Sequence, residues 1–247
     1  MLIYDSHCHL AALSNDLRTY KIAVPAIRLA DNSALLEYRR VNPQAKIGCG
    51  IHPWYLEDCN PADSDPATIK QQLRHQIIKS NPDFIGETGL DALKPNFARQ
   101  LQLMEIHLEL ALEFNLPLVV HCVRAYNQLL SILKRFPKSR GVVHAYNANH
   151  HCATQLWRKN FFLGIGSIIL NPNSQLAKAA AQLPLEQLLL ESDAPYMPAV
   201  AKSPATSSVC LIYAQRLAQL QQKSLRSIIA EANHNWERLF NPRFSGI

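Results

Sequence analysis

The sequence has no apolar run that approaches the roughly 18 residues needed to cross a membrane. A basic start followed by an apolar stretch is also missing, because residues 1–4 lead directly to Asp5 and His7. Its cysteines are scattered and none forms a Cys-x-x-Cys pair, which argues against a zinc ribbon or a thioredoxin-like motif. These absences predict a cytoplasmic protein with reduced thiols and no membrane partner.

Runs of lysine and arginine, strict repeats and breaks in composition are absent as well. We therefore expect residues 1–247 to form a single domain with a large core. The net charge is +6, and it is spread along the chain. This charge mildly favours an anionic partner, such as nucleic acid or a phosphorylated ligand, and a merely solvated basic surface explains it about as well.

Eight short apolar segments predict β-strands that are buried on both faces, because they are continuous rather than alternating. They cover residues 1–4, 21–27, 46–51, 83–86, 117–120, 141–143, 161–165 and 188–190. Helices are predicted over 31–41, 67–80, 96–115, 125–135, 149–159, 174–182, 205–222 and 224–240. Parallel strands that alternate with helices in a chain of about 250 residues predict an α/β fold, the (β/α)8 TIM barrel.

Side chains with metal-ligand chemistry follow these apolar runs directly. In an extended chain His7 and His9 point the same way. A lone histidine of this kind is more often a hydrogen-bonded core residue, and a lone carboxylate there could cap a helix or stabilise a turn. In a barrel, however, the carboxyl ends of all strands converge on one face. The favoured interpretation is a metal site built from His7, His9, Glu87, His121, His144 and Asp193.

Four imidazoles and two carboxylates can hold two divalent ions. Ligands of nitrogen and oxygen without thiolate suit Zn, Mn or another transition ion better than Ca. Paired ions can activate a water molecule and neutralise charge on the leaving side. A carboxylate can bridge two ions, and Asp193 is a candidate for a ligand that also accepts a proton from the water.

Six motifs, in order along the chain, resemble those of the TatD family of metal-dependent hydrolases, within the amidohydrolase-like barrels. They are DSHCHL, GIHP, GETGLD, PLVVHC, GVVHAY and ESDAPYMP. The resemblance implies that His7, His9, Glu87 and Asp193 surround one metal and that Glu87, His121 and His144 surround a second. It also implies a Mg- or Zn-dependent deoxyribonuclease, with His52 near the substrate phosphate.

The chain departs from the family pattern at positions that face the substrate. Ala11 stands where the family usually has an acidic residue. Val123 stands where it usually has arginine, so the neighbouring Arg124 becomes the candidate substrate contact. Residues 202–206 (KSPAT) replace an Arg-Asn-Glu-Pro stretch. The complete ligand set with altered substrate contacts resembles the uncharacterised hydrolase branch of the family more than its founding nuclease.

The expected activity is hydrolysis of phosphodiester bonds in DNA by metal-activated water. A first alternative is a metal-dependent hydrolase of a small amide, ester or lactone. A second is a catalytically silent barrel that binds nucleic acid. The sequence is compatible with a monomer and does not determine the oligomeric state. Trp54 and Tyr196 follow ligand-bearing segments and could line a pocket, where either could stack on a base or simply pack.

Overall fold

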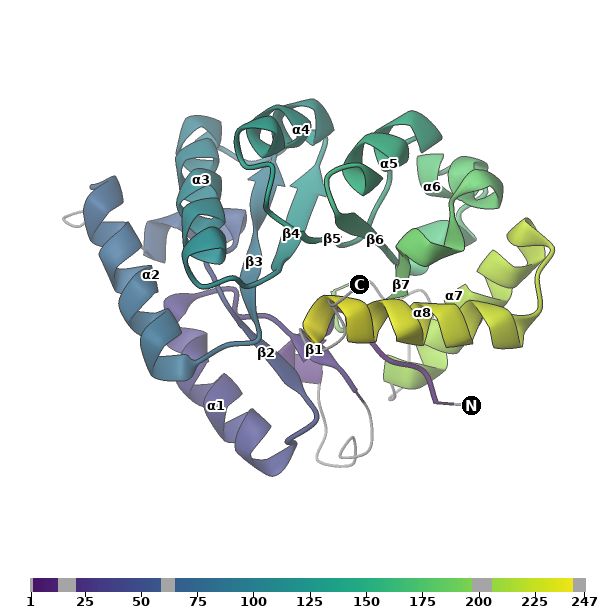
Figure 1. Ribbon diagram of the computed structural model, residues 1–247, viewed down its shortest axis with the longest axis horizontal. Coiled ribbons are helices and arrows are strands. Elements are labelled where there is room, and N and C mark those ends of the chain that lie inside the picture. The colour runs from purple at the N-terminus through teal and green to yellow at the C-terminus, as the bar shows by residue number, and fades with distance from the viewer. Residues whose placement is uncertain (1, 13–20, 59–64, 197–205, 242–247) are drawn as a thin grey trace.

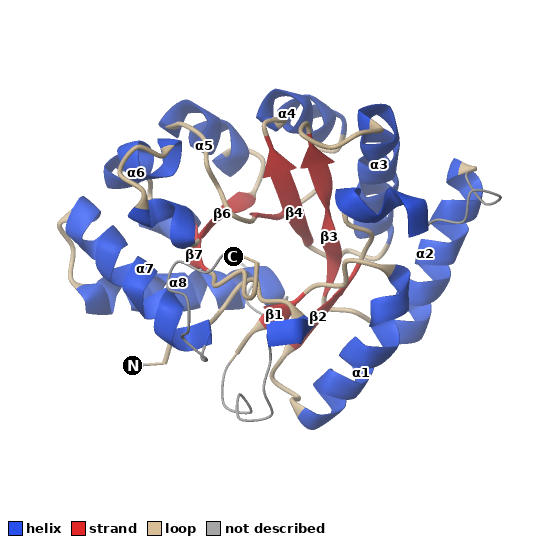
Figure 2. Ribbon diagram, turned by 180° about the vertical axis from the view of Figure 1, so that it is seen from behind, coloured by secondary structure: helices blue, strands red, loops and turns tan. Residues whose placement is uncertain are grey.

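The computed structural model describes residues 2–12, 21–58, 65–196 and 206–241. Its centre is a sheet of seven parallel strands that pair in the order of the sequence. The sheet is curled, with helices around its outside (Figure 2). The strands are β1 (Ala23–Val24), β2 (Lys46–Cys49), β3 (Phe84–Asp91), β4 (Leu118–Val123), β5 (Gly141–Val143), β6 (Phe161–Ile165) and β7 (Leu188–Leu190). The α/β class is confirmed.

The first predicted strand, over residues 1–4, is not a strand in the described part of that segment. Asp5 instead forms an isolated parallel bridge with Ile22, just before β1. The backbone N–H of Ser6 donates to the carbonyl of Leu190 at the end of β7, over 2.9 Å. The segment after Tyr4 therefore lies between the two edges of the sheet without forming a regular strand.

The Asp5 side chain explains this irregularity. Its Oδ1 accepts hydrogen bonds from the backbone N–H groups of His7 (3.1 Å) and Ser192 (3.0 Å). A regular ladder would use such N–H groups for carbonyls of the neighbouring strand. The described residues thus form seven strands and this irregular segment, and a full eight-stranded barrel is not confirmed.

The helices match the predicted ones to within two residues at most ends. They are α1 (Asn32–Val41), α2 (Pro66–Ser80), α3 (Phe97–Glu113), α4 (Tyr126–Arg135), α5 (His150–Trp157), α6 (Gln175–Ala179), α7 (Thr206–Gln221) and α8 (Leu225–Phe240). Asp65, Asn149, Ser174 and Ser224 each cap a helix by accepting a backbone hydrogen bond from its first turn. The predicted helix over 174–182 is wrong in its second half, which is a 3-10 turn at Ala180–Gln182. Residue 205, the predicted start of α7, lies outside the described residues.

Alternate residues of strands β3 to β7 enter two different apolar layers. Ile85, Val120 and Leu163 pack toward the helices in the larger core. Their neighbours on the strands face the concave side and form the layer that we call the apolar plug. It consists of Ala23, Phe84, Val119, Val142, Phe162, Leu189 and, from α8, Trp236, Leu239 and Phe240. In Figure 1, α8 passes in front of the curled sheet, where it covers the amino ends of the strands.

None of the described helices combines the length and the apolar content that a membrane crossing requires.

Candidate metal centre

The sequence had suggested that Glu87 follows a strand, but Glu87 lies inside β3. The strand continues to Asp91, and its pairing with β4 shifts register between Ile85 and Thr88. Gly86 occupies this irregularity with φ +147°, and a Cβ atom there would lie 2.7 Å from the Val119 carbonyl oxygen. Glycine therefore permits the irregular backbone that precedes the buried carboxylate of Glu87.

His121 is also inside its strand, because β4 extends to Val123. His144 follows β5 directly, as predicted. His7 and His9 come from the irregular segment, and Asp193 follows β7 with φ +50°. These six side chains are all buried and lie close together.

One carboxylate oxygen of Glu87 faces the histidines of the first segment. Glu87 Oε2 lies 3.3 Å from His7 Nε2 and 3.7 Å from His9 Nε2. The two Nε2 atoms are 3.1 Å apart. Asp193 Oδ1 lies 3.2 Å from His9 Nε2 and 3.6 Å from His7 Nε2. Together these four residues are the set that the family pattern assigns to one metal.

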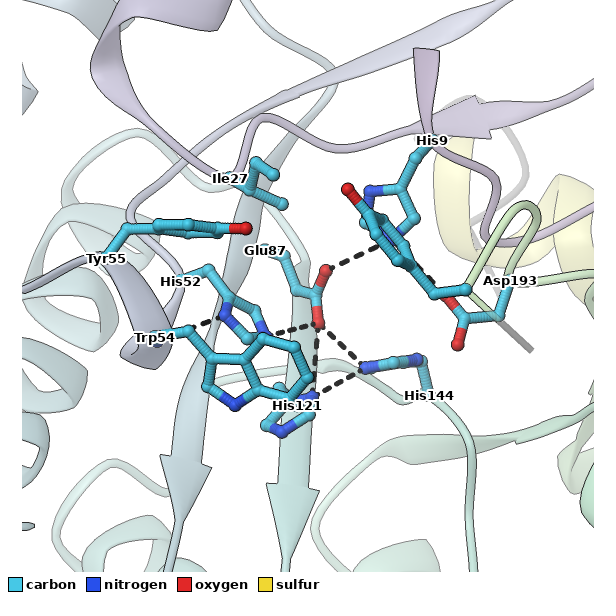
Figure 3. A pocket seen from close by; sticks show the side chains of 10 residues that line it. His9, Ile27, His52, Trp54, Tyr55, Glu87, His121, His144 and Asp193 are labelled. Carbon is cyan, nitrogen blue, oxygen red and sulfur yellow. Dashed lines mark hydrogen bonds and ion pairs between the residues drawn. The ribbon is translucent and has the colours of Figure 1, made fainter. Parts of the chain in front are cut away.

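The other oxygen of Glu87 faces a second group of imidazoles (Figure 3). Glu87 Oε1 lies 2.8 Å from His144 Nε2, 3.3 Å from His121 Nδ1 and 3.2 Å from His52 Nε2. His121 Nδ1 and His144 Nε2 are 3.1 Å apart. The two oxygens of one carboxylate thus point to two separate groups of nitrogen atoms.

This arrangement fits divalent cations. Ligand atoms about 2.1 Å from a shared tetrahedral ion lie about 3.4 Å from one another, close to the separations seen here. Three sets of ligand atoms each lie within 4.8 Å of one another: His7, His144 and Asp193; His7, His9 and Glu87; and His52, Glu87 and His121. The side chains bring ring nitrogens and carboxylate oxygens within a few ångströms of one another, and a shared cation would bind their lone pairs in common.

The electrostatics of the cluster differ between His7 and His144. Burial lowers the pKa of the His7 imidazole to about 4, with the neighbouring His144 acting in the same direction. Burial also opposes protonation of His144, but Glu87, Asp193 and Glu191 outweigh it and raise its pKa to about 10. The carboxylates around His144 therefore stabilise a cation at this position.

His52 has a different role from the other imidazoles, which follows from its tautomer. Its Nδ1 accepts a hydrogen bond from the Trp54 backbone N–H over 3.1 Å. Burial lowers the pKa of His52, which favours the neutral ring. A neutral ring that accepts at Nδ1 carries its proton on Nε2, the atom that faces Glu87. His52 is thus arranged to donate a hydrogen bond rather than to bind a metal through Nε2.

The cluster opens into a pocket. Its lining consists of His9, Ile27, His52, Trp54, Tyr55, Glu87, His121, His144, Asp193 and Tyr196. Trp54 and Tyr196 are 47% and 53% exposed at its mouth. Arg124 follows β4 as an exposed residue and is not among the lining residues. Residues 202–205 of the altered stretch lie outside the described residues.

The sequence analysis gave no role to three buried carboxylates that lie next to the histidines: Asp5, Asp91 and Glu191. Glu191 is fully buried, accepts the Ala145 N–H over 2.5 Å and lies 3.9 Å from His144 Nδ1. A Cβ atom at Gly164 would meet its Oε2 at 2.0 Å, so β6 makes room for it. Burial raises the Glu191 pKa to about 8. Each of these acids lies within a motif that also carries a predicted ligand. That closeness in the sequence was the signal that could have identified them as part of the site.

His107 of α3 was given no role from the sequence, yet it supports the His52 loop. Its Nε2 accepts the backbone N–H of Ile51 over 3.1 Å, and its Nδ1 donates to the Leu103 carbonyl over 2.7 Å. Burial lowers its pKa to about 4. The neutral ring therefore links α3 to the residue that precedes His52.

Fold and site together define an α/β protein whose curled parallel sheet carries a histidine–carboxylate cluster suited to metal. Residues 4–241 match the model of the family described as TatD related DNase, so the chain belongs to this family. The resemblance in the motifs is thereby confirmed, and the protein is a TatD-family metal-dependent hydrolase.

Its relatives share this description. The uncharacterized metal-dependent hydrolase YjjV of Escherichia coli is 31% identical over 210 residues, which cover 78% of this chain and 80% of YjjV. An uncharacterized metal-dependent hydrolase of Buchnera aphidicola is 27% identical over 263 residues, which cover 98% of this chain and 97% of the relative. The crystal structure of YjjV, described as a TatD homolog, superposes on this chain with a TM-score of 0.82 at 28% identity. The superposition covers 97% of this chain and 98% of the YjjV chain.

Proposed function

We propose that this protein hydrolyses phosphodiester bonds in DNA with two divalent ions, Zn, Mg or Mn. The observation that carries the proposal is Glu87, whose two oxygens face two separate groups of imidazoles. The ligands would be His7, His9, Glu87, His121, His144 and Asp193. The family description and the net charge of +6 support an anionic nucleic-acid substrate.

When bound, such ions would polarise a phosphate oxygen and lower the pKa of water. The chain supplies the remaining parts. Asp193 lines the pocket and is 6% exposed, so its carboxylate can take a proton from the attacking water. His52 presents an N–H at Nε2 beside Glu87 and can donate it to a phosphate oxygen. The buried histidines and Glu87 keep these groups fixed, so they need not reorganise during the reaction.

The proposal includes three further expectations from the sequence. The segment that contains Ser6 and Cys8 would act as the first strand of a (β/α)8 barrel, formed as a single domain over residues 1–247. It is supported by hydrogen bonds from Ser6 N–H to Leu190 and from Cys8 N–H to Ala23, one on each side. Arg124 would contact DNA that extends beyond the pocket. A cytoplasmic location stays a prediction.

The decisive experiment is a cleavage assay with single-stranded DNA, double-stranded DNA and bis-p-nitrophenyl phosphate. Each substrate is tested after chelation and after addition of Mg, Mn or Zn. We expect cleavage that requires metal and that falls by about 10²–10⁴-fold in Asp193→Asn, the scale of a lost general base. Absence of cleavage with every cation, in protein that binds metal, would contradict the proposal.

The pocket lining supports a second candidate, a hydrolase of a small amide, ester or lactone. The surface of the pocket is mostly apolar and carries a few convergent polar groups, as is usual for sites that take small molecules. A panel of such substrates, run with the same metals and the same Asp193→Asn control, separates this candidate from the first.

A further inference from the structure

Asp91 connects a candidate metal ligand with the mouth of the pocket. Its Oδ2 accepts the indole N–H of Trp54 over 2.7 Å and lies 3.5 Å from His121 Nε2. Its Oδ1 accepts the Leu93 backbone N–H over 2.9 Å. Asp91 itself is buried, with 2% of its surface exposed. One carboxylate therefore holds two rings, one at the metal cluster and one at the rim.

The contact with Asp91 decides which nitrogen of His121 is free. When Nε2 donates its hydrogen to Asp91, the lone pair of the neutral ring is on Nδ1. Nδ1 is the atom that faces Glu87 at 3.3 Å and His144 at 3.1 Å. Carboxylates that hold the second nitrogen of a histidine ligand in this way fix its tautomer and its orientation.

Trp54 is held at one edge while much of its surface stays open. It is 47% exposed and lines the pocket. Edge contacts with His52 and His121 join ring centroids 5.1 and 5.9 Å apart, and Lys94 Nζ lies 4.4 Å from the indole centroid. Figure 3 shows the indole beside His52 and His121. A large, exposed ring that is already fixed loses little conformational entropy when another ring stacks on it.

We propose that Trp54 stacks on a planar ring of the substrate and that Asp91 is a positioning residue that holds Trp54 and His121 together. The identity of that ring, a nucleobase, rests on the function proposed above. The Lys94 ammonium lies over the indole ring, and its positive charge favours the phosphate that accompanies a base. Asp91 thus links the recognition of the base to the geometry of the metal cluster.

The stacking half of the proposal is tested by tryptophan fluorescence. The chain has three tryptophans, and Trp54 is the one at the pocket. The experiment uses Asp193→Asn protein with Zn²⁺, titrated with deoxyadenosine monophosphate or with inorganic phosphate. We expect quenching by the nucleotide and none by phosphate. The quenching should disappear in Trp54→Leu and persist in Trp157→Phe, a control on α5.

Affinity gives the second readout for Trp54. We expect Trp54→Leu to weaken nucleotide binding about tenfold by calorimetry, whereas Trp54→Phe, which keeps an aromatic ring, should retain most of the affinity. Equal affinity of Trp54→Leu and the parent would overturn the stacking role. If that happens while DNA is still cleaved with metal, the proposed function stands and this inference alone fails.

The positioning half is tested by metal binding, without any turnover. Zn²⁺ affinity is measured by chelator competition, and the Co²⁺ absorption spectrum reports the ligand geometry. We expect Asp91→Ala and Asp91→Asn to weaken Zn²⁺ binding about 10- to 100-fold and to alter the spectrum. Glu109→Gln, an exposed change on α3, should match the parent in both measurements.

The Asp91 variants should remain folded, because the backbone of Asp91 is held independently. The Gln100 side chain accepts its N–H over 2.7 Å and donates to its carbonyl over 3.1 Å. Asp91→Asn also keeps the size of the side chain. Parent-like Zn²⁺ affinity and an unchanged Co²⁺ spectrum in both Asp91 variants would overturn the positioning role.

Discussion

The two ends of the curled sheet are built from the same strands and carry opposite kinds of side chain. On β3, Phe84 belongs to the apolar plug and Glu87 to the metal cluster. On β4, Val119 and His121 divide in the same way. The plug is filled by tightly packed apolar groups, whereas the other end collects imidazoles and carboxylates that are buried against one another.

This difference shows where the fold gains its stability and where its function is built. Burial of apolar surface stabilises the plug end, and α8 completes that packing with Trp236 and Phe240. Burial of charged groups near one another is unfavourable unless each has a partner. At the cluster end a bound cation would be such a partner. Changes at the cluster should therefore affect metal and activity, and changes at the plug should affect stability.

The largest effect on function is expected for Glu87→Gln, which removes the charge shared by both groups of imidazoles. Metal content after dialysis should fall by at least one ion per chain. Turnover should fall by about a thousandfold, because a direct metal ligand affects the ion more than a residue that only holds a ligand in place. Emission spectra and far-UV circular dichroism should match the parent because the amide has nearly the same shape. Full metal content in the variant would contradict the role given to Glu87.

At the opposite end, Trp236→Ala should lower the free energy of unfolding by about 3–5 kcal/mol, the usual cost of a large cavity in a core. The residue is 1% exposed and packs against Tyr4 and Phe240, with ring centroids 5.4 and 5.2 Å apart. Urea unfolding measures the loss. Metal bound per folded molecule should be unchanged, and a parallel loss of metal affinity would show that the two ends are coupled.

A smaller and mixed effect is expected at the border between the two ends. Gly164→Ala would place a methyl group 2.0 Å from Glu191 Oε2, so the carboxylate must move within a fully buried site. We expect the free energy of unfolding to fall by about 1–3 kcal/mol, which is typical of overpacking. We also expect weaker Zn²⁺ binding through His144. Thermal unfolding with and without Zn²⁺ separates the two contributions. An unchanged midpoint in both conditions would mean that Glu191 moves freely and does not support His144.

The sequence was a good guide to the helices and to the side chains that gather in the cluster. Helix ends follow local rules, such as the capping of α2 by Asp65 and of α8 by Ser224, which depend on neighbouring residues. The members of the cluster were recognisable as a group because several histidines and carboxylates follow buried apolar runs whose carboxyl ends meet on one face. The structure brings all six predicted ligands together, with His52 facing the same carboxylate.

The errors arose where long-range contacts decide the local structure. The first strand was predicted from its apolar residues, yet the Asp5 carboxylate takes up N–H groups of His7 and Ser192 and makes the segment irregular. β3 and β4 run further than their apolar cores because they pair with each other beyond Gly86. Arg124 is exposed and lies outside the pocket lining, so its contact with the substrate stays a prediction.

The sequence by itself determined the class of fold, the family and the side chains with metal chemistry, because periodicity, capping and motifs are encoded locally. The tertiary structure decided what surrounds those side chains. Which oxygen of Glu87 faces which histidine, and which nitrogen of His121 is free, depend on atoms brought together from distant segments. Orientation and tautomer follow from such contacts, and local sequence carries no information about them until the chain has folded.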